Sequence, residues 1–295
     1  MIEKQQEKLK FDLSHARHES AHCLTPGLFK SVPKGQREKL KLDVKYIYAD
    51  GEEVRFVGFE PLGADDLRIL QGLVALSGPS GTLLPPNTEE EMPKKLRELL
   101  NPKHQGIYQN ALAINGSFRK ILSEIGLSAS GDNITALKRS LVRMSNVTVI
   151  IKNQSKIESY HLMSFAIDEK TQNFHVALNP RLTQAILGTR NHARLDMDEV
   201  RHIKSDVTRL IHQRLCGWIW PGKKAKVELD TLCSYAWPEQ AKPDTQRKRK
   251  QYAKNAVMEL TTLGWTVEEY ATHKYEITRP SKLIHEMVRG INHET

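Results

Sequence analysis

A run of basic and amide side chains between residues 247 and 255 is suited to bind a polyanion. It contains Arg247, Lys248, Arg249, Lys250, Gln251, Lys254 and Asn255. Arginine and lysine pair with phosphates and with the O6 and N7 atoms of guanine, while glutamine and asparagine suit N6 and N7 of adenine. A solvated helix face is the alternative explanation for such a run taken alone. The elements around the run favour binding to DNA.

The residues that must position this run have the pattern of a helix. Apolar residues recur at helical spacing, and Gly264 follows where a helix would stop. The apolar stripe consists of Ala253, Ala256, Val257, Leu260 and Leu263. Arg247, Lys248, Gln251, Lys254 and Asn255 fall on the opposite face. The basic side chains are therefore predicted to line the exposed face of an amphipathic helix.

Short elements on both sides of this helix complete a recognisable order. An apolar segment at 231–237 precedes it, and two β-rich runs at 265–270 and 274–279 follow it as a hairpin. Short helix, turn, basic helix and hairpin is the order of a winged helix-turn-helix, whose second helix enters the major groove. His273 and Lys274 at the hairpin tip would contact adjacent phosphates or the minor groove.

The first half of the chain repeats this plan. A short helix at 117–126 is followed by a second helix that carries Ile134, Leu137, Leu141 and Met144 inward. The side chains expected to face DNA from the second helix are Thr135, Lys138, Arg139 and Arg143. Strands at 147–151 and 157–165 would form the first wing, with Lys152 and Lys156 in its tip.

Together these elements predict an α+β fold with two tandem winged helix-turn-helix domains and an N-terminal arm. We expect the arm at residues 1–41, the domains at 42–170 and 171–280, and a tail at 281–295. Further elements are a hairpin around Asp50-Gly51, a mobile insertion at 82–115 and one long helix over 197–218.

The composition is that of a soluble cytoplasmic protein with a polyanionic partner. The chain has 295 residues, 39% hydrophobic and 27% charged, and a formal net charge of +9. Its cysteines, Cys23, Cys216 and Cys233, form no CxxC pair, which favours a reducing compartment. No signal peptide is evident, and no apolar run reaches the roughly 18 residues of a membrane span.

Several groups of side chains raise the question of metal binding or catalysis. His15, His18, His22 and Cys23 lie close together in sequence, as do His212 and Cys216 with Cys233 beyond them. The first set lacks the second ligand pair that a structural zinc site needs, and a helix routinely buries residues like those of the second set. Asp196 and Asp198 suit a helix start as well as catalysis. We therefore expect no metal, no cofactor and no enzymatic activity.

Motifs spread over residues 13–280 resemble the IncQ-type plasmid replication initiators, the RepC family. They are SHARH (14–18), AHCL (21–24), PGLF (26–29), EPLGADDLRILQGLVA (60–75), VALNP (176–180), MDEVR (197–201), HQRLCGWI (212–219), LGWTV (263–267) and YEITRP (275–280). The first dozen and last fifteen residues lie outside the resemblance.

This resemblance implies an origin-binding protein. Such a protein would recognise repeated sites (iterons) in double-stranded plasmid DNA, melt an adjacent A·T-rich segment and help to load the plasmid-encoded helicase and primase. Several copies would bind adjacent repeats, with the second domain providing most of the base readout. The main alternative is a winged-helix transcriptional repressor that binds an operator as a dimer. A third alternative is a primase or nicking enzyme.

Overall fold

The computed structural model describes residues 15–33 and 35–281 of the chain. The predicted C-terminal tail, apart from Ser281, lies outside these residues. The helices are α1 (Ser20–Leu24), α2 (Ala64–Ser80), α3 (Glu91–Leu99), α4 (Phe118–Glu124), α5 (Gly131–Ser145), α6 (Pro180–Leu187), α7 (Met197–His202), α8 (Asp206–Trp218), α9 (Leu229–Ala236) and α10 (Pro243–Thr261), with 3-10 turns η1 (Arg37–Lys39) and η2 (Gln105–Tyr108).

The strands form separate sheets whose order does not follow the chain. They are β1 (His15–Glu19), β2 (Leu42–Ile47), β3 (Glu53–Gly58), β4 (Gly81–Leu84), β5 (Lys103–His104), β6 (Ala111–Ser117), β7 (Thr148–Lys152), β8 (Ile157–His161), β9 (Met163–Asp168), β10 (Asn173–Leu178), β11 (His192–Asp196), β12 (Lys224–Glu228), β13 (Thr266–Ala271) and β14 (Lys274–Thr278). The sheet orders are β2-β3-β7-β8-β5, β4-β6-β10-β9, β12-β14-β13 and β1-β11.

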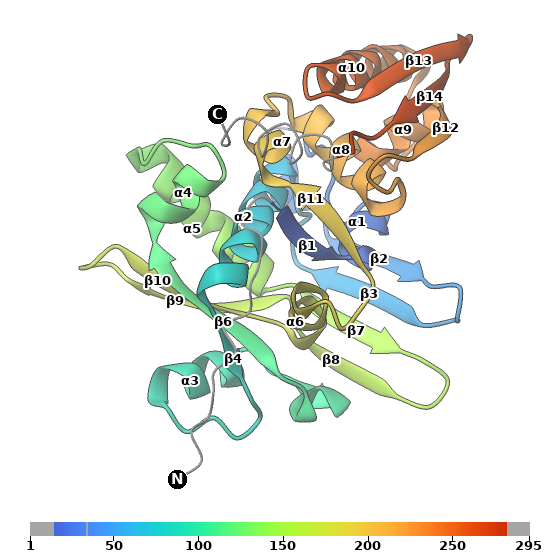
Figure 1. The fold of residues 1–295 in the computed structure, drawn as a ribbon. Helices are drawn as coiled ribbons and strands as arrows, with labels where there is room; N and C mark the ends of the chain where they lie inside the picture. The colour runs from blue at the N-terminus through green and yellow to red at the C-terminus, as the bar shows by residue number, and fades with distance from the viewer. Residues whose placement is uncertain (1–14, 34, 282–295) are drawn as a thin grey trace, which may run out of the picture.

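Helix α2 runs through the middle of the molecule (Figure 1). It packs against β1, β6, α4, α5 and α8, so elements from both halves of the chain meet on it. The close approach of α4 requires a glycine, because a Cβ atom at Gly72 would collide with Ile125. This helix therefore anchors both the first sheets and the C-terminal unit.

The C-terminal unit consists of α8, α9 and α10 with the sheet β12-β14-β13, and it lies at the upper right of Figure 1. The apolar stripe of α10 is buried against α8 and α9. The hairpin β13–β14 follows α10, and Gly264 between them has a φ of +88°. The predicted basic helix and the hairpin after it are confirmed, as are the hairpins formed by β2–β3 and β7–β8.

The prediction that the N-terminal residues form a separate arm is wrong for residues 15–24, which belong to the main fold. Strand β1 pairs antiparallel with β11, with His15 opposite Asp196 and Glu19 opposite His192. Helix α1 after it is buried against α8. Burial of Ala16, Ala21 and Cys23 supplies apolar contact to the core, so this segment is an integral part of the fold.

The predicted boundary between residues 170 and 171 is also corrected. It falls in the turn between β9 and β10. These two strands pair antiparallel, with Met163 opposite Leu178 and Asp168 opposite Asn173. Strand β10 pairs on its other side with β6. One buried apolar cluster extends from Ala16 to Ile277. A division at this point would separate paired strands, and the two parts share a core.

Two further expectations fail for local reasons. Residues 82–115 are not a loose insertion, because β4 and β6 pair there and Leu96 of α3 is buried under the sheet. The helix expected over 197–218 is two helices. The chain is extended at Ile203, and the Ser205 hydroxyl accepts a hydrogen bond from the Thr208 N–H, which caps a new helix.

Two buried histidines make the fold sensitive to acid. Burial lowers the pKa of His18 to about 3 and that of His22 to about 4. No described residue hydrogen-bonds to their ring nitrogens. In the unfolded chain both titrate near pH 6.5, so it binds more protons than the folded protein below about pH 6.5. Stability is therefore present above that pH and is lost as the pH falls toward the folded pKa values.

We expect each histidine to remove about 1.4 kcal/mol of unfolding free energy per pH unit below about pH 6.5. Urea unfolding at a series of pH values measures this slope. The variant His22→Phe, whose new ring would lie near Phe56, should have a shallower slope than the parent. An unchanged slope in that variant would show that other groups control the acid sensitivity.

Candidate nucleic-acid interface

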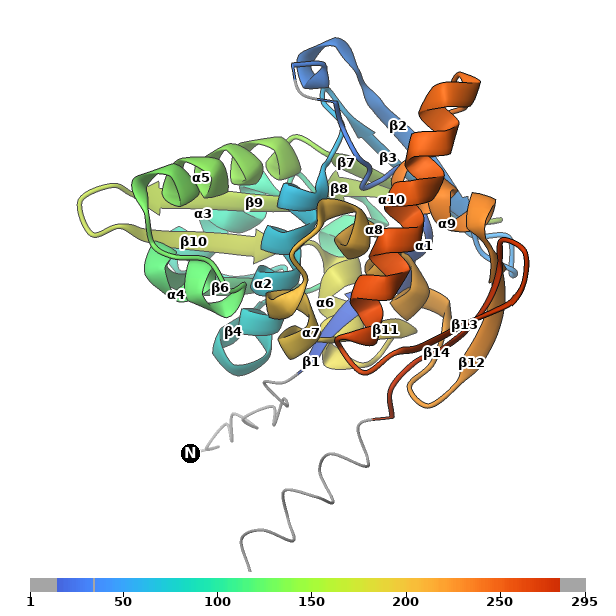
Figure 2. The ribbon, with the colours of Figure 1, turned by 90° about the horizontal axis from the view of Figure 1, so that it is seen from above.

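Helix α10 presents its basic N-terminal half to solvent. Pro243 begins the helix, as suits a first-turn position, and Asp244 lies in the first turn. Ala253, Ala256 and Val257 in its second half are buried. The N-terminal half of α10 extends beyond the elements that its C-terminal half packs on, as seen from above in Figure 2. The buried C-terminal half therefore holds α10 in place, and its projecting N-terminal half is accessible to a partner.

Two groups of basic side chains can be distinguished on α10. Arg247 and Lys248 are exposed, and neither forms an ion pair with a described residue. In contrast, Arg249 Nη1 donates to the carbonyl oxygen of Glu239 at 2.7 Å and its guanidinium lies 5.6 Å from the centre of the Trp237 ring. Lys250 pairs with Asp230 at 2.9 Å. Arg249 and Lys250 thus hold α10 to the turn and helix before it.

The amide side chains lie one helical turn apart and contact each other. Gln251 Nε2 donates to Asn255 Oδ1 at 2.9 Å, and both residues are exposed. The half-buried Lys254 lies near Glu269 of β13. The pKa of that carboxyl is below its usual value, because the His273 N–H donates to it and Lys254 lies nearby. The exposed Tyr252 on the same helix was not among the predicted contact residues.

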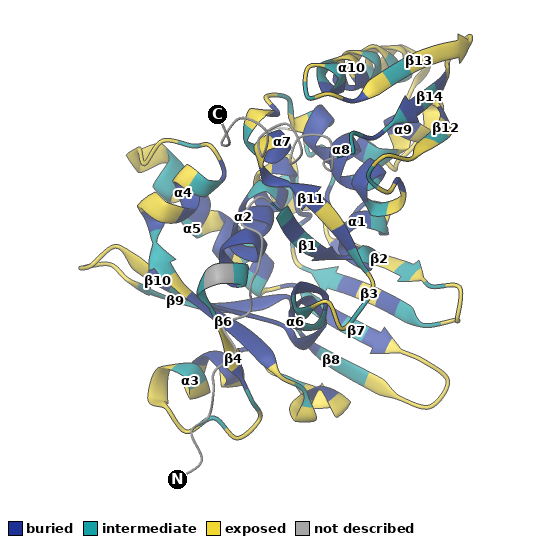
Figure 3. Cartoon of the chain, in the orientation of Figure 1, coloured by how far each residue is buried: buried dark blue, intermediate teal, exposed yellow. Residues whose placement is uncertain are grey.

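The tip of the β13–β14 hairpin is exposed but not strongly basic. His273 occupies the tip with a φ of +61°, and Lys274 pairs with Glu228 of β12 at 3.2 Å. Exposed Glu268 and Glu269 lie on the neighbouring strand (Figure 3). The predicted hairpin is present, and the exposed His273 side chain at its tip forms no ion pair with a described residue.

Two predicted contact residues of α5, Lys138 and Arg143, form interactions within the protein. Arg143 is directed to the start of α2, where its Nη2 donates to Asp66 at 2.7 Å and to Asp65 at 2.8 Å. Lys138 pairs with Glu169 at 2.6 Å and lies 5.2 Å from the Phe118 ring centre. The expectation that Arg143 faces outward is corrected, because its partner Asp66 is fully buried and needs a cation.

The remaining predicted residues of the first half are accessible. Arg139 is exposed, and the hydroxyl of exposed Thr135 donates to the Gly131 carbonyl at 2.9 Å. Lys152 and Lys156 are exposed at the β7–β8 turn, which Asn153 shapes by accepting the Lys156 N–H at 2.8 Å. Helix α5 lies in the left part of Figure 2 and α10 in the right part.

One buried cluster has the residue types of a metal site. Glu199, His212 and Cys216 offer ligand atoms within 4.8 Å of one another. These atoms already contact each other, since His212 Nε2 lies 2.6 Å from Glu199 Oε2 and 3.4 Å from Cys216 Sγ. Burial lowers the pKa of His212, but Cys216 and Glu199 outweigh it and raise the pKa to about 9. The cluster therefore works as a buried ion pair, and zinc would need a fourth ligand.

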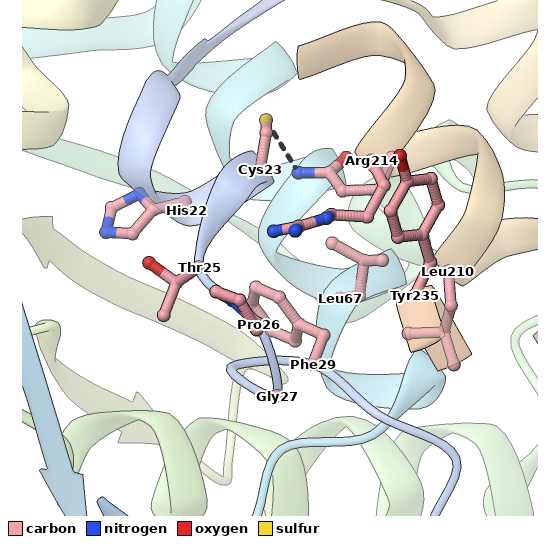
Figure 4. A pocket seen from close by; sticks show the side chains of 11 residues that line it. His22, Cys23, Thr25, Pro26, Gly27, Phe29, Leu67, Leu210, Arg214 and Tyr235 are labelled. Atoms are coloured by element: carbon pink, nitrogen blue, oxygen red, sulfur yellow. Dashed lines mark hydrogen bonds between the residues drawn. The ribbon is translucent and has the colours of Figure 1, made fainter. Parts of the chain in front are cut away.

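A small pocket between α1, α8 and α9 also contains ionisable side chains (Figure 4). His22, Cys23, Arg214 and Tyr235 line it, and Gln213 Nε2 donates to Cys23 Sγ at 3.0 Å. Burial raises the pKa of the Cys23 thiol, which makes it unreactive. The volume of about 10 Å³ is about that of one water position, so this pocket has no room for a cofactor.

Comparison with known sequences assigns the chain to a family. The family profile described as replication protein C (RepC) matches residues 10–281. This chain belongs to the RepC family. The resemblance indicated by the sequence motifs is thereby confirmed, and the chain is of the replication-initiator class. No curated protein sequence matches the chain.

Two solved structures have a similar fold. This RepC-family chain is similar to a selenomethionine derivative of domains 2 and 3 of RctB, with a TM-score of 0.52 and 11% identity over 88% of this chain and 98% of that one. A second crystal structure of RctB domains 2–3 has a TM-score of 0.50 and 11% identity, over 86% and 96%. At this identity the likeness shows a shared α+β fold. Within the described residues, no helix is long and apolar enough to cross a membrane.

Proposed function

We propose that this RepC-family protein starts plasmid replication by binding repeated sites in the origin through two winged helix-turn-helix units. The observation that carries the proposal is the geometry of α10. This long helix buries its apolar stripe and leaves Arg247 and Lys248 exposed and unpaired among the described side chains. A protruding rod of this width and charge fits the DNA major groove.

The order of the elements supports the winged-helix interpretation. In the C-terminal unit α8, β12, α9, α10, β13 and β14 follow one another, and the hairpin pairs with β12 in one sheet. The first half has α4, α5 and the β7–β8 hairpin in a comparable order. In the proposal, α10 supplies most of the base readout. The residues Thr135, Arg139, Lys152 and Lys156 would add contacts to the phosphates.

Opening of the A·T-rich segment would draw on binding energy rather than on nucleotide hydrolysis. Several copies on adjacent repeats would share the cost of bending the duplex at its flexible steps. In this proposal the plasmid helicase and primase join after the strands have separated, and the protein itself makes and breaks no covalent bond. Incubation with supercoiled origin DNA and magnesium should then leave the DNA without nicks or primers.

Footprinting on the source plasmid tests the proposal. We expect protection of direct repeats, together with reactivity of a neighbouring A·T-rich segment toward a probe specific for single strands. Protection of a single palindrome without any reactive segment would instead identify a dimeric repressor.

A further inference from the structure

Strand β12 is the outer strand of the C-terminal sheet and has one unpaired edge (Figure 2). The carbonyl of Lys223 accepts from the Arg279 N–H at 2.9 Å, and the Leu229 N–H donates to the His273 carbonyl at 2.9 Å. Because bonding alternates along an antiparallel strand, the N–H groups of Lys224, Lys226 and Glu228 are directed away from β14. No described residue bonds to these groups.

A recess with aromatic walls lies beside this edge. Its volume is about 310 Å³, and Trp218, Thr231 and Tyr235 line it on the helix side. Lys226, Glu228 and Tyr270 line it on the sheet side. Trp218 and Tyr270 are 37% and 49% exposed, and Trp218 on the helix side offers apolar surface to an incoming side chain.

The charges at the edge indicate what kind of strand fits it. Lys224 pairs with Glu276 at 3.0 Å, and Glu228 pairs with Lys274 at 3.2 Å. Lys226 has no carboxylate partner among the described residues, and its Nζ lies 4.8 Å from the Tyr270 ring centre. A carboxylate directly opposite Lys226 on an added strand would complete a cross-strand ion pair.

We propose that an extended segment of another protein adds to β12 as a further antiparallel strand. The segment carries an acidic residue opposite Lys226, and the apolar side chains next to that residue in sequence are directed to the face where the recess lies. Strand addition derives its affinity from backbone hydrogen bonds and its specificity from the pockets for alternate side chains. This surface is separate from the exposed face of α10 and goes beyond the proposed DNA binding.

Other occupants fit less well. A second copy added around a two-fold axis through Lys226 would place the two Lys226 side chains opposite each other, and like charges in that position repel. Single-stranded DNA also stacks on aromatic rings but needs a positively charged groove. Here Glu228, Glu276 and Glu268 lie among the lysines and balance them.

The experiment uses a random-peptide library displayed on phage and panned against the full chain. We expect enrichment of peptides with the pattern apolar, acidic, apolar. A synthetic copy of an enriched peptide should bind the variant Lys226→Pro about tenfold more weakly, because proline removes an outward N–H while leaving the bonds to β14 intact. The variant Lys226→Ala keeps that N–H and should lose about two- to fivefold through the missing charge pair.

Thermal unfolding and binding of duplex DNA should be the same for both variants and the parent, which separates this proposal from the proposed function. Trp218→Ala provides a second check and should also weaken the peptide, because it removes one wall of the recess. Equal peptide binding by Lys226→Pro and the parent would overturn the proposal, as would a panning experiment without enrichment. The recess would instead be assigned to single-stranded nucleic acid if oligothymidine displaced the peptide and if Lys226→Pro bound oligothymidine as weakly as it binds the peptide.

Discussion

Replacement of Arg181 by methionine is expected to lower the free energy of unfolding by about 3–5 kcal/mol. The Arg181 side chain is 2% exposed, and its Nε donates to Glu19 Oε1 at 2.9 Å while its Nη2 donates to Glu52 at 2.7 Å. Glu19 is fully buried and also accepts from the Tyr48 hydroxyl at 2.5 Å. The pKa of Glu19 is below its usual value, because Arg181 and its neighbours outweigh the effect of burial. Without Arg181 the carboxylate would remain buried with its main counter-charge removed.

Arg190 provides the matched control for this measurement. It contacts the same two carboxylates, but its side chain is 28% exposed and lies 3.6 Å from Glu19. Because solvent screens an exposed pair, Arg190→Met should cost about 1 kcal/mol or less. Urea denaturation of both variants at neutral pH gives the two values. Similar losses of unfolding free energy for the two variants would show that burial does not increase the contribution of the Arg181 ion pairs to stability.

The same ion pairs explain why sequence reasoning missed the role of the N-terminal segment. Glu19, Glu52 and Arg181 come from β1, the β2–β3 turn and α6, and nothing in the local sequence of any of them shows that they meet. Periodicity reports which face of an element is apolar, but it does not report which distant element covers that face. Pairing of β1 with β11 is a contact of this kind.

Elements defined by local signals were predicted well. The apolar stripe from Ala253 to Leu260 predicted α10, and Asp50-Gly51 predicted the turn of the β2–β3 hairpin. The boundary at 170 failed because polar turn residues between β9 and β10 look the same in a linker and in a hairpin. Arg143 was misplaced for a different reason. An arginine at the margin of an apolar stripe can face solvent or reach a buried acid, and only the position of Asp66 decides between them.

The candidate interface was predicted in part for the same reasons. The local signals placed Arg247 and Lys248 on an exposed helical face, as the structure has them. They did not reveal that Asp230 and the Glu239 carbonyl hold Lys250 and Arg249, because these partners lie in the preceding helix and turn. Helix amphipathicity separates inside from outside, whereas the partners of half-exposed cations depend on tertiary packing.

The variant Arg247→Ala is expected to bind origin repeats about 1–3 kcal/mol more weakly than the parent, with a smaller loss on random DNA. This difference arises if the guanidinium reads a guanine edge, where the variant loses a bidentate contact. If Lys248 contacts a phosphate, Lys248→Ala should weaken binding to both kinds of DNA alike. It should also reduce, by about one, the steepness with which the logarithm of the binding constant falls with the logarithm of the salt concentration. Fluorescence anisotropy over a series of salt concentrations measures both quantities.

Lys95→Ala is a control with the same change in net charge. Lys95 is exposed on α3, at the end of the molecule opposite α10 (Figure 1). If α10 forms the interface, Lys95→Ala should bind as the parent does, because a charge at that distance is screened at physiological salt. A loss for Lys95→Ala equal to that of Lys248→Ala would mean that net charge, rather than α10, controls binding. Equal losses of Arg247→Ala on repeat and random DNA would mean that Arg247 contacts phosphates, and base readout would then have to come from other residues, with Gln251 and Asn255 the next to test.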